Sequence, residues 1–231
     1  MPYLDHPSAL IRALAREAAR RTGTDPLAYY RAGIQAAEPR VGAVGGLAET
    51  GSRADGPLLT ALLDNPAPQV RVHALRALRS LDVVPMPRVT ALLRDGSTTV
   101  VKEAAATLAP SATQLPADLL WDMLTDPQRP AVRRAGYRLL SRHDRLTALR
   151  AALVVSGDTH PRLAAQGKND ATTQIRNLAP HPWRTRPVPS LDASPAQAAE
   201  LLALAEQRRT ELTEDVVRLL RDALRPGPGN R

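Results

Sequence analysis

The chain has 231 residues, of which 43% are hydrophobic but only 3% aromatic, with no Phe. Leu, Ala and Val must therefore form its core, and this composition favours helices over a β or α/β fold. It has no Cys, which excludes disulfides, thiolate metal sites and cysteine catalysis, and no run of about 20 apolar residues that would span a bilayer, so a soluble cytoplasmic protein is expected. The net charge of +8 does not by itself indicate nucleic-acid binding, because 29 of the 31 basic residues are Arg, a bias that a GC-rich genome also produces.

A turn followed by a helix recurs along the chain. The segment DHPSALIRALAREAA opens the first copy at Asp5, and EPRVGAVGGLAETG is a weaker copy without the Asp. Three regular copies follow at a period of 31 residues, and each has Asp, then Val six residues later, then a basic residue. The basic residues are Arg71, Lys102 and Arg133, after Asp64, Asp95 and Asp126. Such a fixed period indicates a repeat protein.

Each regular copy predicts a helical hairpin. Short apolar helices are expected over residues 57–63, 87–93 and 117–124, each before its Asp turn. After the turn, apolar residues recur at helical spacing, as in Val70, Ala74, Ala77, Leu78 and Leu81. One hairpin cannot bury its apolar face alone, so neighbouring hairpins must stack. The first copy lacks a preceding helix; either it is a half-unit cap, or the true chain begins further upstream.

This frame resembles the HEAT repeat family, in its short bacterial form, over about residues 1–165. The resemblance implies an all-α solenoid, a superhelix of about five stacked hairpins whose second helices line the concave side. It also implies a ladder of bonds between adjacent repeats, formed by Asp64, Asp95 and Asp126 with Arg71, Lys102 and Arg133. The period is shorter than the roughly 40–47 residues usual for the family.

The C-terminal part departs from the period. A further first helix is expected over 146–155, followed by a degenerate copy without a Val-Arg pair. We therefore predict a repeat array over 1–178, a Pro-rich linker over 179–193, a capping helical hairpin over 194–225 and a disordered tail over 226–231.

No candidate for catalysis is persuasive. The five His residues lack metal-ligand spacing, so neither a metal site nor a cofactor site is predicted. Asp118 and Asp122 lie one helical turn apart and are suited to acid–base work, but this spacing is more typical of the wet face of a helix. Gly45–Gly46 is isolated and indicates close packing or a weak helix, not a phosphate loop. We predict no catalytic residues and expect a non-enzymatic protein.

One enzyme class has a similar architecture. Certain alkyl-base DNA glycosylases are built from HEAT-like repeats and hold the damaged base against aromatic side chains. This chain has only two Trp: Trp121 is expected in the core, and Trp183 falls in the linker. A base-stacking platform would be thin, so glycosylase activity is the least favoured alternative.

Positive charge is concentrated in one region. Residues 129–186 contain 12 Lys and Arg but only 3 Asp and Glu. The repeat register places Arg76 and Arg138 at equivalent positions of their second helices. We predict a partner-binding basic strip formed by Arg76, Arg79, Arg134, Arg138 and Arg142. The alternative is that these arginines are solvated or paired with carboxylates distant in sequence.

The strip suggests two functions. The first is a scaffold that binds a protein partner with an acidic surface, and the second is a nucleic-acid binder. The scarcity of Lys and of interleaved aromatic residues favours the protein partner. Steep salt dependence would indicate nucleic acid. Oligomeric state stays open.

Overall fold

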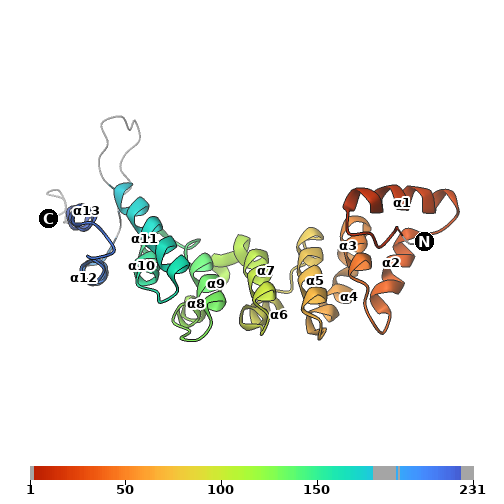
Figure 1. Ribbon diagram of the computed structural model, residues 1–231, viewed down its shortest axis with the longest axis horizontal. Helices are drawn as coiled ribbons and strands as arrows, with labels where there is room; N and C mark the ends of the chain where they lie inside the picture. Colours follow the sequence, from red (N-terminus) through yellow and green to blue (C-terminus); the bar gives the residue numbers. More distant parts are fainter. Residues whose placement is uncertain (1–2, 179–190, 192, 225–231) are drawn as a thin grey trace, which may run out of the picture. The chain divides into compact units, whose positions relative to one another are not determined.

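The computed structural model describes residues 3–178, 191 and 193–224, and every regular element within these ranges is a helix (Figure 1). No helix in this described part is long and apolar enough to cross a membrane. The chain divides into two compact units, Met1–Pro110 and Ser111–Arg231. Each unit is an α solenoid of stacked helical hairpins, as the repeat period predicts.

The first unit contains three hairpins that follow a single N-terminal helix. Its helices are α1 (Ala9–Arg21), α2 (Pro26–Gln35), α3 (Val41–Thr50), α4 (Gly56–Ala61), α5 (Pro68–Ser80), α6 (Met86–Ala91) and α7 (Thr98–Leu108). A 3-10 turn, η1 (Arg53–Asp55), precedes α4, and the turns η2 (Leu62–Asp64) and η3 (Leu92–Arg94) extend α4 and α6. The second helices α3, α5 and α7 pack side by side as a row (Figure 1).

The second unit contains two array hairpins and a terminal one. Its helices are α8 (Ala117–Leu124), α9 (Pro130–Leu140), α10 (Arg145–Ser156), α11 (Pro161–Arg176), α12 (Pro195–Gln207) and α13 (Glu214–Ala223), after the 3-10 turn η4 (Ala109–Gln114). Helix α12 packs on α10 and α13 packs on α11, so the predicted hairpin caps the last repeat. The division at residue 178 stays a prediction, and nearly all of the Pro-rich stretch and the whole 226–231 tail lie outside the described residues.

Local sequence explains the hairpin boundaries. A proline occupies the first turn of α4, α5, α6, α9 and α11, where its missing N–H leaves no helical bond unmade. The apolar stripe predicted on α5 is buried at Val70, Ala74, Ala77 and Leu78. Helix α2, which the repeat frame did not predict, begins after Asp25, whose side chain accepts a bond from the Leu27 N–H.

The weak second copy forms a regular helix, α3, because its glycines allow close packing. A Cβ at Gly46 would lie 2.2 Å from the ring of Tyr30, which is completely buried. Gly46 therefore serves the contact between α2 and α3, as the packing interpretation predicts, while a Cβ at Gly45 would meet the Arg12 guanidinium of α1 at 3.4 Å.

Two ladder rungs lie within single units, and one of them joins two of the predicted residues. In the first unit, Arg71 Nη2 lies 2.8 Å from Asp95 Oδ1, and Nη1 donates to the carbonyls of Asn65 and Pro66 at 2.7 and 3.0 Å. The guanidinium thus joins its own turn to the next one, as expected for Arg71 and Asp95.

The second rung uses an aspartate that the sequence frame missed. Arg133 makes a two-pronged bond to Asp158, with Nε–Oδ2 at 2.7 Å and Nη2–Oδ1 at 2.9 Å. Its Nη1 also donates to the Asp126 carbonyl at 2.8 Å. The side chains of Arg133 and Asp158 are only 8% and 6% exposed, so the degenerate last copy still keeps its ladder bond.

Other ladder assignments differ. Asp64 pairs with Arg88 on the exposed side of the hairpin, and the Asp126 side chain accepts bonds from the backbone N–H groups of Gln128 and Arg129 in its own turn. Because Lys102 and Asp126 lie in different units, the rung between them stays a prediction.

Candidate functional site

The residues of the predicted basic strip fall into two groups with different surroundings. Arg76 and Arg79 lie on α5 in the first unit, and Arg134, Arg138 and Arg142 lie on or just after α9 in the second. Each unit therefore carries its own candidate surface.

In the first unit, one carboxylate pairs with both arginines of the strip. Arg76 Nε lies 3.0 Å from Glu103 Oε2, and Arg79 Nη2 lies 3.1 Å from Glu103 Oε1. The Glu103 side chain is only 12% exposed. An acidic ligand at this surface would have to compete with a carboxylate that already holds both guanidinium groups, so this part of the strip is a poor anion site.

In the second unit, packing orients α9 so that its arginines face outward. Val132, Ala135, Tyr137, Leu139 and Leu140 are buried. A Cβ at Gly136 would lie 2.8 Å from the backbone oxygen of Leu120, so α9 sits directly on α8.

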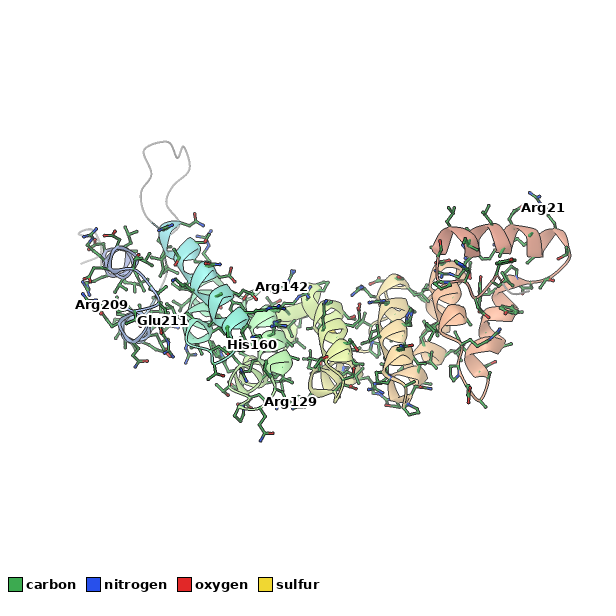
Figure 2. The ribbon with its side chains drawn as sticks, in the orientation of Figure 1. Arg21, Arg129, Arg142, His160, Arg209 and Glu211 are labelled. Atoms are coloured by element: carbon green, nitrogen blue, oxygen red, sulfur yellow. The ribbon has the colours of Figure 1, made fainter. Side chains whose placement is uncertain are left out.

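The remaining face of α9 carries Arg134 and Arg138, which are exposed, as is Arg142 in the following turn. In Figure 2, Arg142 lies at one end of α9 and Arg129 at the other. Arg133, one position from the stripe, is buried in its bond to Asp158. The ladder residue Arg133 and the exposed arginines Arg134 and Arg138 therefore have different surroundings on the same helix.

Arg134, Arg138 and Arg142, which we call the arginine stripe, form one wall of a cleft that we name the arginine cleft. The cleft is open, has a volume of about 570 Å³, and is lined by Arg134, Arg138, Ser141, Arg142, Gln166 and Asp170. The first four residues come from α9 and its C-terminal end, and the last two come from α11. The cleft therefore runs between the second helices of two successive hairpins.

The three guanidinium groups of the cleft are unpaired. Within the part of the chain that the structure describes, no carboxylate lies within 4.0 Å of Arg134, Arg138 or Arg142. By contrast, Arg129 pairs with Asp126 and Arg150 with Glu200 in the same unit. Register explains the difference from the first unit: Glu103 lies 27 residues after Arg76, whereas the residue 27 positions after Arg138, the equivalent of Arg76, is Ala165.

A hydrogen bond from a buried tyrosine fixes the far wall. Tyr137 is 1% exposed, and its hydroxyl donates to Asp170 Oδ2 at 2.5 Å. Burial is the main cause that raises the pKa of Tyr137 well above its usual range, and the bond to Asp170 raises it further. The hydroxyl therefore keeps its proton. The bond ties α9 to α11 below the arginines.

The candidates for acid–base and stacking chemistry lie elsewhere. Asp118 and Asp122 are exposed on α8. Trp121 is half-buried instead of lying in the core, with the Arg150 guanidinium 4.3 Å above its ring. Trp183 lies outside the described residues. In residues 3–178, 191 and 193–224, no group of three or more His, Asp or Glu could hold a metal ion.

The cleft wall on α11 was not predicted from sequence. Gln166 and Asp170 belong to the degenerate last copy, in which the Val-Arg frame is lost. A usable signal was present in the spacing of the pairs: Asp95 lies 24 residues after Arg71 and Asp158 lies 25 after Arg133, which aligns α11 with the second helices before it.

A family model and one solved structure agree with this architecture. Residues 56–141 match the family model for HEAT repeats. Among solved structures, the designed armadillo repeat protein YIII(Dq)4CqI is similar at 15% sequence identity with a TM-score of 0.51, covering 86% of this chain and 98% of that one. An engineered protein, structural genomics target OR329, also matches at 15% identity with a TM-score of 0.47, covering 87% and 96%. No curated protein matches the sequence.

Proposed function

We propose that this chain, whose residues 56–141 match the family model for HEAT repeats, is a non-catalytic cytoplasmic scaffold that binds an acidic segment of a protein partner in the arginine cleft. The observation that carries the proposal is the contrast between the two units. Arg76 and Arg79 share the carboxylate of Glu103, whereas Arg134, Arg138 and Arg142 line a cleft without a paired carboxylate among the described residues.

The energetics favour binding over a structural role for these three side chains. Exposed guanidinium groups stabilise a fold little, since exposed ion pairs contribute about 0–1 kcal/mol. Three like charges along one helix face repel one another, and a bound anion would relieve that repulsion. Carboxylates and guanidinium groups match in two-pronged geometry, so an acidic protein segment suits the cleft.

The test is direct binding of a synthetic peptide. The probe is a fluorescein-labelled peptide with glutamate at alternate positions and glycine or serine between them. We expect saturable binding by fluorescence anisotropy, and we expect the combined change of Arg134, Arg138 and Arg142 to Glu to weaken it at least about 100-fold, since three pairs of up to about 1 kcal/mol are each lost and replaced by repulsion.

Two controls make the result specific. The melting temperature of the triple variant should stay within a few degrees of the unmodified protein, because the changed side chains are exposed. Arg76→Ala, at the equivalent register of α5, should change affinity less than Arg138→Ala. If the triple variant keeps its affinity for the peptide, the proposal is wrong.

A labelled oligothymidylate tests the other class of partner. If this probe binds more tightly than the peptide, and its affinity falls steeply as the salt concentration rises, the ligand of the cleft is nucleic acid and not an acidic protein.

A further inference from the structure

The two walls of the arginine cleft have opposite character. The α9 wall presents Arg134, Arg138 and Arg142, while the α11 wall presents Gln166 and the carboxylate of Asp170. Across the described residues, the Tyr137 hydroxyl is the one hydrogen-bond donor to Asp170, and none of the three arginines lies within 4.0 Å of that carboxylate. The Asp170 carboxylate is therefore held in place by the Tyr137 hydroxyl and remains open toward the cleft.

We propose that Asp170 is a specificity-determining residue, which selects an acidic peptide segment that also brings a cationic side chain to the α11 wall. This inference rests on the proposed function of the cleft. A ligand that carries only negative charge would gain from the α9 wall but would be repelled by Asp170. A ligand with one lysine or arginine among its acidic residues would satisfy both walls.

The spacing of the stripe suits an extended peptide. Arg134 and Arg138 are four residues apart on α9, so about 6 Å separates them along the helix axis, and Arg142 follows in the turn after the helix. In an extended chain, side chains on the same face recur about every 6.6–6.8 Å, and intervening side chains point to the opposite face. Alternate acidic residues would thus face α9, while a cationic residue between them would face Asp170.

The same arrangement disfavours nucleic acid. A nucleic-acid strand carries a negative phosphate at every nucleotide and offers no cationic side chain to the α11 wall. Repulsion by one fixed carboxylate is an effective way to reject a wrong partner, because specificity comes from clashes and unpaired charges as well as from attraction. Asp170 would in this way distinguish the two ligand classes that a purely basic cleft would accept.

The test compares two peptides that differ at one residue. Both have glutamate at alternate positions; one carries lysine between two central glutamates, and the other carries methionine there. Although the lysine peptide is less negative overall, we expect the unmodified protein to bind it about fivefold more tightly, the effect of one exposed ion pair of about 1 kcal/mol. A surface that responds only to net charge would prefer the methionine peptide.

Asp170→Asn supplies the matching change in the protein. The asparagine side-chain oxygen still accepts the Tyr137 hydrogen bond, while the charge is lost. The preference for lysine should disappear in this variant, and its affinity for oligothymidylate should rise severalfold. Tyr137→Phe, which removes the hydrogen bond but leaves the charge, should keep the preference. Asp122→Asn, at an exposed position of α8, should change neither the preference for the lysine peptide nor the affinity for oligothymidylate.

The outcomes separate this inference from the proposed function. Equal or weaker binding of the lysine peptide by the unmodified protein would overturn the role of Asp170 while leaving the acidic-segment proposal standing. A preference for lysine that persists in Asp170→Asn would overturn that role in the same way. Failure of both peptides to bind would overturn the proposed function, and with it the inference.

Discussion

At the scale of single residues, the buried guanidinium–carboxylate pairs determine how one hairpin joins the next. Arg133 bonds Asp158 with two parallel prongs and reaches the Asp126 carbonyl as well. Because both charged side chains are almost fully buried, each depends on the other for the bonds it has lost to water. This explains why the fold keeps the pair even where the surrounding repeat sequence has diverged.

Removing one member of the pair should be costly. Asp158→Ala leaves the Arg133 guanidinium buried without its carboxylate, and we expect a loss of about 3–5 kcal/mol in the free energy of unfolding. Asp95→Ala, in the rung with Arg71, should also destabilise. Urea unfolding measures both changes, with the exposed Asp122→Ala as the control, expected within about 0.5 kcal/mol. Similar midpoints for Asp158→Ala and Asp122→Ala would rule out a ladder that holds the hairpins together.

The same pair should make stability depend on pH in the acid range. Burial by itself would raise the pKa of Asp158, but bonds from Arg133 and from the His160 N–H outweigh burial and lower it. A carboxyl with a lowered native pKa stabilises the fold above its unfolded pKa of about 3.9, and this stabilisation is lost as pH falls through the native value.

The measurement is urea unfolding from about pH 6 to about pH 3. Asp158→Asn should start less stable and lose less stability over this range than the unmodified protein. Parallel curves for the two proteins would show that Asp158 does not contribute to the acid dependence.

At the scale of elements, small residues let the helices of one hairpin approach closely. The contact of Gly46 with the Tyr30 ring joins α2 to α3. The contact of Gly136 with the backbone of Leu120 joins α8 to α9, which in turn points the arginine stripe into the cleft. At these positions the stability gained from close helix packing exceeds the stability that glycine costs through its low helix propensity.

Adding one methyl group at such a contact should separate the two helices. Gly46→Ala places a Cβ against a buried ring that cannot move freely, so we expect a loss of about 1–3 kcal/mol in unfolding free energy. Gly96→Ala is the matched control, because a Cβ there would meet nothing within 4 Å.

Hydrogen exchange gives a second readout of the Gly46→Ala variant. In a stacked repeat array the damage should be local, with faster exchange in α2 and α3 and little change in α9. If Gly46→Ala unfolds at the same urea concentration as Gly96→Ala, the packing account of the weak copy fails.

At the scale of the whole molecule, periodicity made most of the helices predictable. The 31-residue frame gives the hairpins α4–α5, α6–α7 and α8–α9, because turn Asp, Val and basic residue recur there at fixed positions. Helix α2 was missed because its segment lacks the frame. The superhelical shape stays a prediction.

The candidate site was only partly predictable. The arginine stripe follows from the four-residue spacing of Arg134, Arg138 and Arg142 in the sequence, although only the first two lie within α9. Asp170, Gln166 and the Glu103 that pairs with Arg76 and Arg79 come from neighbouring helices, and identifying them requires knowing which faces meet. The period contains part of this information, since Arg76 and Glu103 are 27 residues apart, close to one repeat. Charge counts along the sequence cannot distinguish a guanidinium held by Glu103 from one left open.

The measurement that tests the central claim most directly is a nuclear magnetic resonance titration of the full chain with the acidic peptide. Backbone amide and arginine Nε–Hε signals locate the bound ligand residue by residue. We predict the largest shifts at Arg134, Arg138 and Arg142 and in α11 around Gln166 and Asp170, with little change at Arg76 and Arg79. Shifts centred on Arg76 and Arg79, or spread evenly over all exposed arginines, would contradict a binding site in the arginine cleft.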